Sequence, residues 1–452
     1  MNIKFNNKSI EVSENETLIE IARREGIHIP SLCYAKEAKH KSSCMVCAVK
    51  NCTTGQIIPS CSTFPMEGIQ IETESEEVKQ VRTLSLELLL GDHRADCEAP
   101  CKMACPAGFD IAQMNRLYDA GKEEDALVFL RNELVIPATL CYICNAPCEK
   151  ICRKNDIDKA VSIREIKKEL VAKTILENIQ KPKLNGKKIG ILGSDPAGLS
   201  AAYHLQQLGY IVTVFEKATS ALVPYLNTED APIEIIDLEL NAIQQTGVEF
   251  VLSCENPSLS NFDGIVSTTC ENPKSDWMIL ETKSKQPARL VREGQKLAMQ
   301  MHLSLLSSKN KEVSEIKPFN SNYARFSETE KLRLEKEMQK TERESGCLYC
   351  DCAKKENCKL RTFATDFAIK NTRYSKNSTF EALDRQHIHG NIWFEPAKCI
   401  KCGLCVYNSD NGFTFKYRGY GMQVVLPEEN KTNIKEELVE LCPTGALYSI
   451  DN

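Results

Sequence analysis

The sequence lacks the features that would point to a membrane, a secretory pathway or nucleic acid. No stretch approaches the roughly 18 consecutive apolar residues that span a bilayer, and residues 1–5 show no basic segment followed by an apolar run. The net charge is only -5, and lysine and arginine are dispersed along the chain. We therefore expect a cytoplasmic protein with no integral membrane segment and no nucleic-acid partner.

Cysteine is the residue that is abundant instead. The chain of 452 residues has 22 cysteines, and all but Cys52, Cys254 and Cys270 fall into four groups. In a reducing compartment, clustered cysteines usually hold metal or act in redox chemistry. The three that stand apart are most simply small buried hydrophobic residues.

Hydrophobic periodicity predicts the elements of the first third of the chain. Residues 3–5 and 9–12 are two short alternating runs typical of a β-hairpin, and residues 17–22 follow as a helix. Apolar residues recur at helical spacing from 76 to 90, and the pattern stays helical from 93 to about 176.

Capping signals and composition mark the later boundaries. Asp110 is a predicted N-cap and Gly121 a predicted helix stop. Residues 188–215 have the pattern of a strand, a glycine turn, a helix and a strand, and a mixed α/β pattern continues to about residue 306. Residues 309–345 are charged and poor in apolar side chains, which predicts a linker followed by an exposed helix.

The first cysteine group is Cys33-x10-Cys44-x2-Cys47-x13-Cys61. Four thiolates suit a 2Fe-2S cluster, which needs two ligands per iron. The stretch resembles the 2Fe-2S domain at the start of the large iron-sulfur subunit of bacterial NADH dehydrogenase and of iron-only hydrogenases, which implies a β-grasp ferredoxin fold. Zinc is the alternative, although tetrahedral zinc sites usually use two close pairs.

The second group has seven cysteines, which suit two 4Fe-4S clusters with one ligand missing. Segments 101–107 and 144–152 resemble the helical domain of the glutamate synthase small subunit and of dihydropyrimidine dehydrogenase, which carries two such clusters. The seven cysteines are Cys97, Cys101, Cys105, Cys141, Cys144, Cys148 and Cys152.

The sequence does not identify the eighth ligand of this group. Some members of that family use a Gln or Glu where this chain has Lys167, and an ammonium cannot bind iron. We favour His93, because His-x3-Cys also opens the histidine-ligated 4Fe-4S motif that follows the 2Fe-2S domain in the NADH dehydrogenase subunit. Glu165 is the second candidate, and a surface role for His93 is the third interpretation.

The third group is Cys347-x2-Cys350-x-Cys352-x5-Cys358. Four thiolates at this spacing could hold either a 4Fe-4S cluster or a structural zinc ion. Spacing alone does not decide between the two.

The fourth group is Cys399-x2-Cys402-x2-Cys405 followed by Cys442-Pro443, and both segments resemble ferredoxin. In two-cluster ferredoxins a further nearby cysteine serves the other cluster, but residue 409 is serine here. Cys442 is therefore expected to complete a single 4Fe-4S cluster.

A glycine turn in residues 188–215 resembles the dinucleotide fingerprint of glutamate-synthase-type flavoproteins. Gly193 and Gly198 match that fingerprint, and Glu216 stands where a ribose-binding carboxylate is expected. Asp195 replaces the second glycine, which adds bulk and negative charge where the backbone should approach a pyrophosphate. The region is also too short for a second nucleotide domain. We expect a degenerate Rossmann-like scaffold, with bound FAD as the alternative.

The predicted fold class is multidomain, α+β and α/β. We expect a β-grasp 2Fe-2S domain, a helical domain with two 4Fe-4S clusters, a truncated Rossmann-like domain, a linker with a charged helix, and a C-terminal ferredoxin-like domain. Their bounds are 1–75, 76–182, 183–308, 309–345 and 346–452.

These patterns predict an electron-transfer subunit with one 2Fe-2S cluster and three to four 4Fe-4S clusters, and with no substrate site of its own. The resemblances imply an NADH-oxidising flavin subunit and a catalytic subunit such as a formate dehydrogenase or hydrogenase as partners, with soluble ferredoxin as a second donor. The alternatives are an FAD-dependent NAD(P)H oxidoreductase with internal clusters and a scaffold protein without electron flux.

Overall fold

The computed structural model describes most of the chain. The linker expected at 309–345 lies almost entirely outside the described residues, and Cys270 lies outside them too. The described residues are 1–93, 97–173, 182–226, 231–269, 277–280, 284–306, 344–369, 374 and 385–449.

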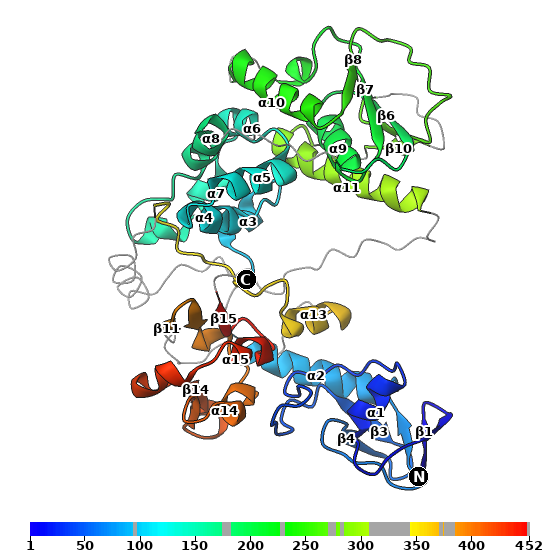
Figure 1. The fold of residues 1–452 in the computed structure, drawn as a ribbon, viewed down its shortest axis with the longest axis vertical. Helices are drawn as coiled ribbons and strands as arrows, with labels where there is room; N and C mark the ends of the chain where they lie inside the picture. The colour runs from blue at the N-terminus through cyan, green and yellow to red at the C-terminus, as the bar shows by residue number, and fades with distance from the viewer. Residues whose placement is uncertain are drawn as a thin grey trace. The chain divides into compact units, whose positions relative to one another are not determined.

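The chain forms two compact units, and the first is interrupted by the second (Figure 1). The first unit contains Met1–Glu98 and Asp351–Asn452. The second contains the described residues between 99 and 350. The chain therefore leaves the first unit after Glu98 and returns to it at Asp351.

The first unit begins with a mixed five-stranded sheet in the order β2-β1-β5-β3-β4. The predicted hairpin is confirmed, because β1 and β2 pair antiparallel, whereas β1 and β5 pair parallel. The strands are β1 (Asn2–Phe5), β2 (Lys8–Glu11), β3 (Ala48–Asn51), β4 (Gln56–Pro59) and β5 (Gln70–Glu72).

Two helices accompany this sheet. Helix α1 (Leu18–Arg24) begins with a capping box in which Thr17 and Glu20 satisfy each other's backbone N–H groups. Helix α2 (Glu76–Asp92) begins at Ser75 and ends at His93. Arg82 on α2 donates to the carbonyl of Ala48 in β3 over 3.0 Å, which fixes α2 against the sheet.

The rest of the first unit comes from the C-terminal part of the chain. Strands β11, β12 and β15 form one antiparallel sheet, and β13 and β14 form another. The elements are α13 (Lys359–Asp366), β11 (Gln386–His389), β12 (Ile392–Phe394), α14 (Leu404–Asn408), β13 (Thr414–Lys416), β14 (Gln423–Val425), α15 (Glu437–Leu441) and β15 (Leu447–Ser449).

The second unit opens with short helices, as the periodicity predicts. Asp110 caps α4 by accepting the N–H of Gln113 over 3.2 Å, and Gly121, at φ +69°, follows the end of α4. Both predicted signals are confirmed. The helices are α3 (Pro100–Ala104), α4 (Ile111–Asp119), α5 (Glu123–Leu134), α6 (Pro137–Ile143), α7 (Pro147–Lys150) and α8 (Ile163–Lys173).

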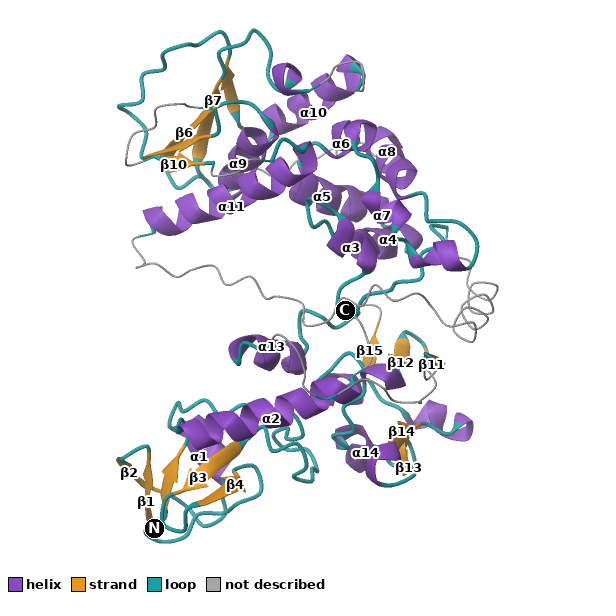
Figure 2. Cartoon of the chain, turned by 180° about the vertical axis from the view of Figure 1, so that it is seen from behind, coloured by secondary structure: helices purple, strands orange, loops and turns teal. Residues whose placement is uncertain are grey.

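A parallel sheet in the order β10-β9-β6-β7-β8 follows, which is a Rossmann-like strand order. Figure 2 shows β6, β7 and β10 of this sheet. Helix α11 packs closely on α9, where a Cβ at Gly294 would collide with the backbone of Ala197. The elements are β6 (Lys188–Leu192), α9 (Pro196–Gln207), β7 (Ile211–Phe215), α10 (Ile233–Gln245), β8 (Glu249–Val251), β9 (Gly264–Ser267), β10 (Met278–Ile279) and α11 (Pro287–Leu305).

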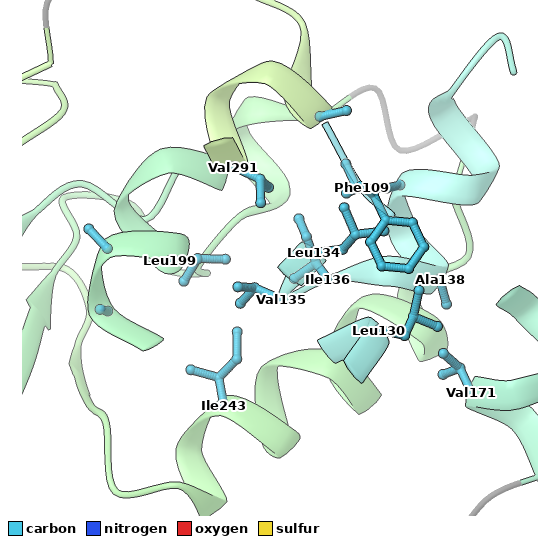
Figure 3. Packing of buried hydrophobic residues seen from close by; sticks show 14 of the residues in the cluster. Phe109, Leu130, Leu134, Val135, Ile136, Ala138, Val171, Leu199, Ile243 and Val291 are labelled. Atoms are coloured by element: carbon cyan, nitrogen blue, oxygen red, sulfur yellow. The ribbon is translucent and has the colours of Figure 1, made fainter. Parts of the chain in front are cut away.

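The helical part and the sheet part of the second unit share one hydrophobic core (Figure 3). Phe109 and Leu134 from the helical part lie in the same cluster as Leu199, Ile243 and Val291 from the sheet part, and all five are buried. The helical part and the sheet part therefore pack against each other within the second unit.

A buried carboxylate strengthens this junction. Glu239 on α10 is 1% exposed and accepts the backbone N–H groups of Ala138 and Thr139 over 2.6 and 2.8 Å. These donors are the otherwise unpaired groups at the start of α6. Burial raises the pKa of Glu239 to about 7, against the lowering effect of the hydrogen bonds from Thr139.

This raised pKa predicts a pH-dependent stability. The folded state binds the Glu239 proton more tightly than the unfolded state, so its contribution is fully present below about pH 4.5 and is lost as pH rises through about 7. In the wild-type protein the unfolding free energy should therefore decrease between pH 5 and 7.5, and in Glu239→Gln this decrease should be smaller by about 3 kcal/mol. Anaerobic urea unfolding at each pH measures it. Glu234→Gln, exposed on the same helix, is the control, and an equally flat profile for it would contradict the assignment.

Among the described residues, no single helix has both the length and the apolar character of a membrane span. Helices α5 and α6 together meet that criterion by length and composition, but they are bent by 68° at the break between them.

Candidate metal centres

The first cysteine group converges in the loops of the N-terminal sheet. Cys33, Cys44, Cys47 and Cys61 are all buried. Hydrogen bonds from the thiols of Cys44 and Cys61 hold the pKa of Cys33 well below its ordinary value. The hydrogen bond from Cys61 likewise lowers the pKa of Cys47 to about 7, although burial opposes it. The same contacts and burial raise the pKa of the donors Cys44 and Cys61. The fold thus places four sulfurs together, as a 2Fe-2S cluster requires.

The fourth group also converges. Burial is the main cause that raises the pKa of Cys405, and Cys399, Cys442 and Cys402 add to it. The chain turns at Lys401, a non-glycine residue at φ +57°, so that its N–H donates to the sulfur of Cys399 over 3.3 Å. These residues fit a single 4Fe-4S cluster, to which they would supply four thiolates.

The first and fourth groups are neighbours within the first unit. Cys33 and Cys44 belong to one apolar cluster with Cys358 and Ile400, and Cys402 packs against it. The pKa of Cys402 is raised mainly by burial, then by its own group, and Cys33 contributes to the rise as well. Cysteines from three of the four sequence groups thus meet at one buried apolar cluster.

Polar contacts fix the same junction. The N–H of Lys39, in the loop between Cys33 and Cys44, donates to the side chain of Asn408 on α14 over 2.9 Å. The amide of Asn408 returns a hydrogen bond to the carbonyl of Lys39 over 2.7 Å. Lys41 lies over the ring of Tyr407, 5.1 Å from its centre. The loop of the first group is therefore held against the helix that follows Cys402.

In the second unit, four cysteines of the second group influence one another. Burial is the main cause that raises the pKa of Cys148 to about 12, and Cys105 and Cys144 add to it. Burial also raises the pKa of Cys141 to about 11, and Cys144 contributes. Cys105, Cys141, Cys144 and Cys148 together offer four sulfur ligands.

Lys167 is buried beside this quartet. Its ammonium lies 4.7 Å from the ring centre of Phe109, and its charge lowers the pKa of both Cys141 and Cys148 against burial. The position therefore places positive charge beside Cys141 and Cys148. The side chain of Glu165 is 68% exposed and pairs with Lys168 over 3.1 Å.

The remaining cysteines of the second group lie with members of the third. A cavity of the second unit is lined by Cys101, Cys152, Cys347 and Cys350. In the first unit, the N–H of Cys352 donates to the carbonyl of Cys97 over 3.2 Å.

Cys352 and Cys97 both influence Cys358 in the first unit, where burial is the main cause that raises its pKa to about 12. His93 is buried in the same unit, at the end of α2. Within the described part of the chain, no three His, Cys, Asp or Glu side chains form a group suited to a single metal ion.

Side chains fill the turn between β6 and α9, where a dinucleotide would bind in a Rossmann fold. Asp195 occupies the start of α9 and accepts the N–H of Gly198 over 2.7 Å, where a pyrophosphate would bind. A Cβ at Gly193 would lie 2.6 Å from the hydroxyl of Thr268, so the turn has no spare room.

The carboxylate of Glu216 also accepts hydrogen bonds from the chain's own groups. Its Oε2 accepts the N–H and the hydroxyl of Ser194 over 2.9 and 2.6 Å, and it accepts the hydroxyl of Tyr225 over 2.9 Å. Burial opposes ionisation, but these hydrogen bonds lower the pKa of Glu216 overall. Gly193, Gly198 and Glu216 therefore do not fit a bound dinucleotide. The sequence revealed Asp195, whereas the Ser194 and Tyr225 contacts needed the structure.

Three protein families match parts of the chain. The 2Fe-2S iron-sulfur cluster binding domain matches residues 1–76, and dihydropyrimidine dehydrogenase domain II, 4Fe-4S cluster, matches residues 74–179. The NAD(P)-binding Rossmann-like domain matches residues 191–241. The chain is a composite of 2Fe-2S, 4Fe-4S and Rossmann-like domains. The resemblance expected from the cysteine spacings is thereby confirmed.

Curated relatives are similar over part of their length. Putative oxidoreductase YgfK of Escherichia coli (strain K12) is 33% identical over 36% of this chain and 17% of its own. NADP(+)-dependent formate dehydrogenase subunit beta of Moorella thermoacetica is 30% identical over 34% and 26%. Glutamate synthase [NADPH] small chain of Bacillus subtilis (strain 168) is 30% identical over 40% of each. The chain thus spans less than half the length of these relatives.

Among solved structures, an NAD+-reducing [NiFe]-hydrogenase in the H2-reduced state is 28% identical over 26% of this chain and 48% of its own, with a TM-score of 0.20.

Two variants test whether the first and fourth groups are separate sites. Cys44→Ala should abolish the 2Fe-2S signal in electron paramagnetic resonance (EPR) spectra of reduced protein, and Cys402→Ala should abolish only a 4Fe-4S signal. Each change removes one ligand and leaves the other group intact. Loss of all signals in either variant would show instead that the clusters fold as one unit.

Asp195 should be worth about 1 kcal/mol of stability as a helix cap. Asp195→Ala removes the acceptor for Gly198 and should lower the unfolding free energy of the chain by that amount, measured in urea. Asp195→Ser keeps an N-cap oxygen and is the matched control. Stability unchanged in the alanine variant would contradict the capping role.

Proposed function

We propose that this chain relays single electrons through iron-sulfur clusters as a subunit of an oxidoreductase complex. Its source is an NADH- or ferredoxin-linked flavin subunit, and its acceptor is a catalytic subunit such as a formate dehydrogenase or hydrogenase. The matches to 2Fe-2S and 4Fe-4S families support the cluster content. The formate dehydrogenase and glutamate synthase subunits among the relatives support a place in a complex.

One structural observation is the main support for the proposed electron relay. Cysteines of separate sites pack into the same apolar cluster of the first unit, where Cys33 and Cys44 lie with Cys358 and against Cys402. Leu86 and Phe363 fill the space with hydrocarbon. Buried neighbouring clusters can exchange electrons with little rearrangement of water, which suits a conduit better than a set of independent structural sites.

The proposed domains are a β-grasp 2Fe-2S domain, a helical domain with two 4Fe-4S clusters, a shortened Rossmann-like scaffold and a C-terminal ferredoxin-like domain. The mixed five-stranded sheet supports the first of these. The cofactors proposed are one 2Fe-2S and four 4Fe-4S clusters. No bound flavin is included, because Asp195 and Glu216 occupy the dinucleotide turn.

An FAD-dependent NAD(P)H oxidoreductase is the second candidate, favoured by the match of residues 191–241 to an NAD(P)-binding Rossmann-like domain. Flavin content separates the two functions. A conduit contains no flavin and takes electrons from NADH only through a partner, whereas the flavoenzyme would contain one flavin per chain and oxidise NAD(P)H alone.

Anaerobically purified protein should contain about 18 iron atoms per chain and no flavin, from one 2Fe-2S and four 4Fe-4S clusters. Iron, acid-labile sulfide, zinc and flavin are measured on one sample. About 14 iron atoms with one zinc would reduce the cluster count and leave the relay standing. Stoichiometric flavin would move the protein to the second class.

Electron relay itself is tested by stopped-flow reduction. Reduced ferredoxin, or NADH with a flavin subunit, should reduce the clusters within the mixing experiment, whereas NADH alone should leave them oxidised. Clusters that no donor reduces, although dithionite does, would contradict the relay and favour a scaffold.

A further inference from the structure

We infer that the third cysteine group is divided between two clusters in place of forming one site. Cys347 and Cys350 belong with Cys101 and Cys152 in the second unit. Cys352 and Cys358 belong with Cys97 in the first. The inference rests on the proposed cluster content, and it assigns ligands that sequence spacing places in other groups.

The first observation is the cavity. Its lining brings Cys101, Cys152, Cys347 and Cys350 together with apolar side chains such as Ile111 and Ile163. Four sulfurs around one apolar cavity match a 4Fe-4S cluster.

The second observation is the shape of the Cys347-x2-Cys350 turn. Tyr349 is at φ +49°, and its N–H donates to the sulfur of Cys347 over 3.4 Å. Lys401 in the ferredoxin-like group has the same arrangement, with its N–H directed at Cys399. A left-handed conformation is sterically unfavourable for a residue that has a side chain, so its repetition beside two Cys-x2-Cys pairs points to a shared task.

The third observation is how Tyr349 is anchored. Its hydroxyl donates to Asp119 on α4 over 2.6 Å, and its ring lies under Arg116, 4.9 Å from the ring centre. Ser345 also donates to Asp119, through its N–H and its hydroxyl. These contacts fix Cys347 and Cys350 to the second unit.

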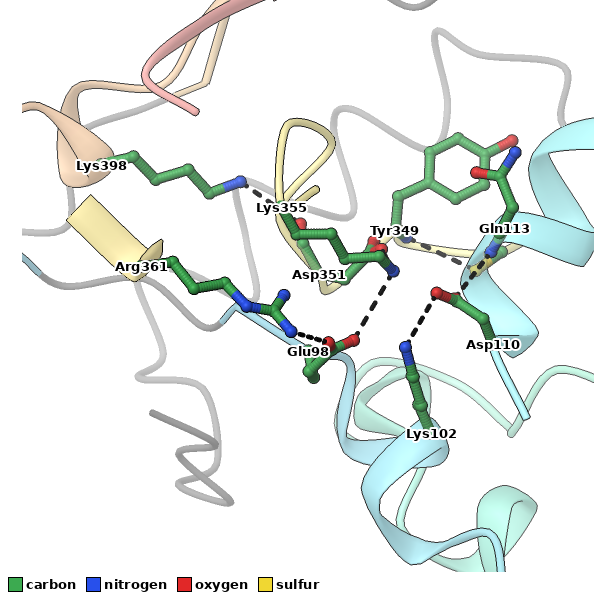
Figure 4. A network of polar contacts seen from close by, with 10 residues as sticks. Glu98, Lys102, Asp110, Gln113, Tyr349, Asp351, Lys355, Arg361 and Lys398 are labelled. Atoms are coloured by element: carbon green, nitrogen blue, oxygen red, sulfur yellow. Dashed lines mark hydrogen bonds and ion pairs between the residues drawn. The ribbon is translucent and has the colours of Figure 1, made fainter. Parts of the chain in front are cut away.

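The fourth observation is that the chain changes partners directly after Cys350. Asp351 pairs with Lys355 over 2.8 Å, and Lys355 and Arg361 both pair with Glu98, over 3.6 and 2.9 Å (Figure 4). All four residues belong to the first unit. Cys352 and Cys358 are thus positioned by contacts different from those that hold Cys350.

The contacts of Cys352 also place it in the first-unit site. Its N–H bonds to Cys97, and a Cβ at Gly445 would lie 2.2 Å from its sulfur, so it packs against the loop after Cys442. His93, buried four residues before Cys97, is the fourth ligand that we assign to this first-unit site.

This assignment supplies the ligand that the second unit lacked for two 4Fe-4S clusters. Cys105, Cys141, Cys144 and Cys148 supply one cluster, and the cavity cysteines supply another. The second unit then needs neither His93 nor Glu165. Its two clusters are held by eight thiolates, two of which come from chain that follows the Rossmann-like sheet.

Iron counts of double serine variants test the division. In the full chain, Cys101→Ser with Cys350→Ser should lose about four iron atoms, because both residues serve one cluster. Cys350→Ser with Cys352→Ser should lose about eight, because they serve two. A single site at the third group predicts the reverse, about eight for the first pair and about four for the second, and that result would overturn the inference.

The control is Cys52→Ser with Cys254→Ser, which should keep all the iron. The 2Fe-2S EPR signal reports whether each variant folds. Where a pair loses that signal, Cys347→Ser replaces Cys350→Ser and Cys358→Ser replaces Cys352→Ser, with the same expected counts. Wild-type protein with far fewer than about 18 iron atoms would contradict the proposed cluster content itself, which is a separate outcome.

Discussion

One buried carboxylate joins the two chain segments that make up the first unit. Glu98 is the last residue before the chain leaves the first unit, and it is 3% exposed. Its partners Lys355 and Arg361 come from the segment that returns. A buried carboxylate that loses its cations costs about 3–5 kcal/mol, so the outgoing and returning segments hold each other in place. Cys97 directly precedes Glu98, and Cys352 directly follows Asp351, which pairs with Lys355. These ion pairs therefore help to position both cysteines.

Buried lysines lie beside cysteines in both units. Burial by itself would lower the pKa of Lys398, but Glu395 and Cys352 raise it, so Lys398 stays protonated. Its ammonium donates to the carbonyl of Asp351 over 3.3 Å, and its charge lowers the pKa of Cys352 against burial. In the second unit Lys167 acts in the same way on Cys141. Cations beside thiolates favour a more negative cluster and so raise its reduction potential.

The sequence predicted what is local. The hairpin, the Asp110 cap and the Gly121 stop depend on a few neighbouring residues, and so do the compact Cys33–Cys61 and Cys399–Cys405 groups. The grouping of Cys347 to Cys358 depends on contacts with Asp119 and Glu98, which lie far away in the chain and follow no spacing rule. Spacing therefore identified the candidate cysteines but could not predict which of them lie together.

The Rossmann-like region illustrates the same limit. Asp195 was visible as a departure from the fingerprint, because a glycine position is defined by its neighbours. The contacts of Glu216 with Ser194 and Tyr225 were not visible, since they depend on how the loop after β7 folds back. The sheet has a Rossmann-like strand order, and side chains of the chain itself form the hydrogen bonds in the turn.

The interrupted first unit also sets an order for synthesis on the ribosome. When residues 1–98 emerge, Glu98 has no cation to meet, because Lys355 and Arg361 are made only after the whole second unit. Domains generally fold as units during synthesis, N-terminal parts first. The N-terminal sheet and then the second unit can fold as they appear, but the region around Cys97 must wait for the C-terminal segment. An incomplete chain that ends before residue 351 would therefore leave the Glu98 carboxylate without Lys355 and Arg361, and Cys97 without its hydrogen bond from Cys352.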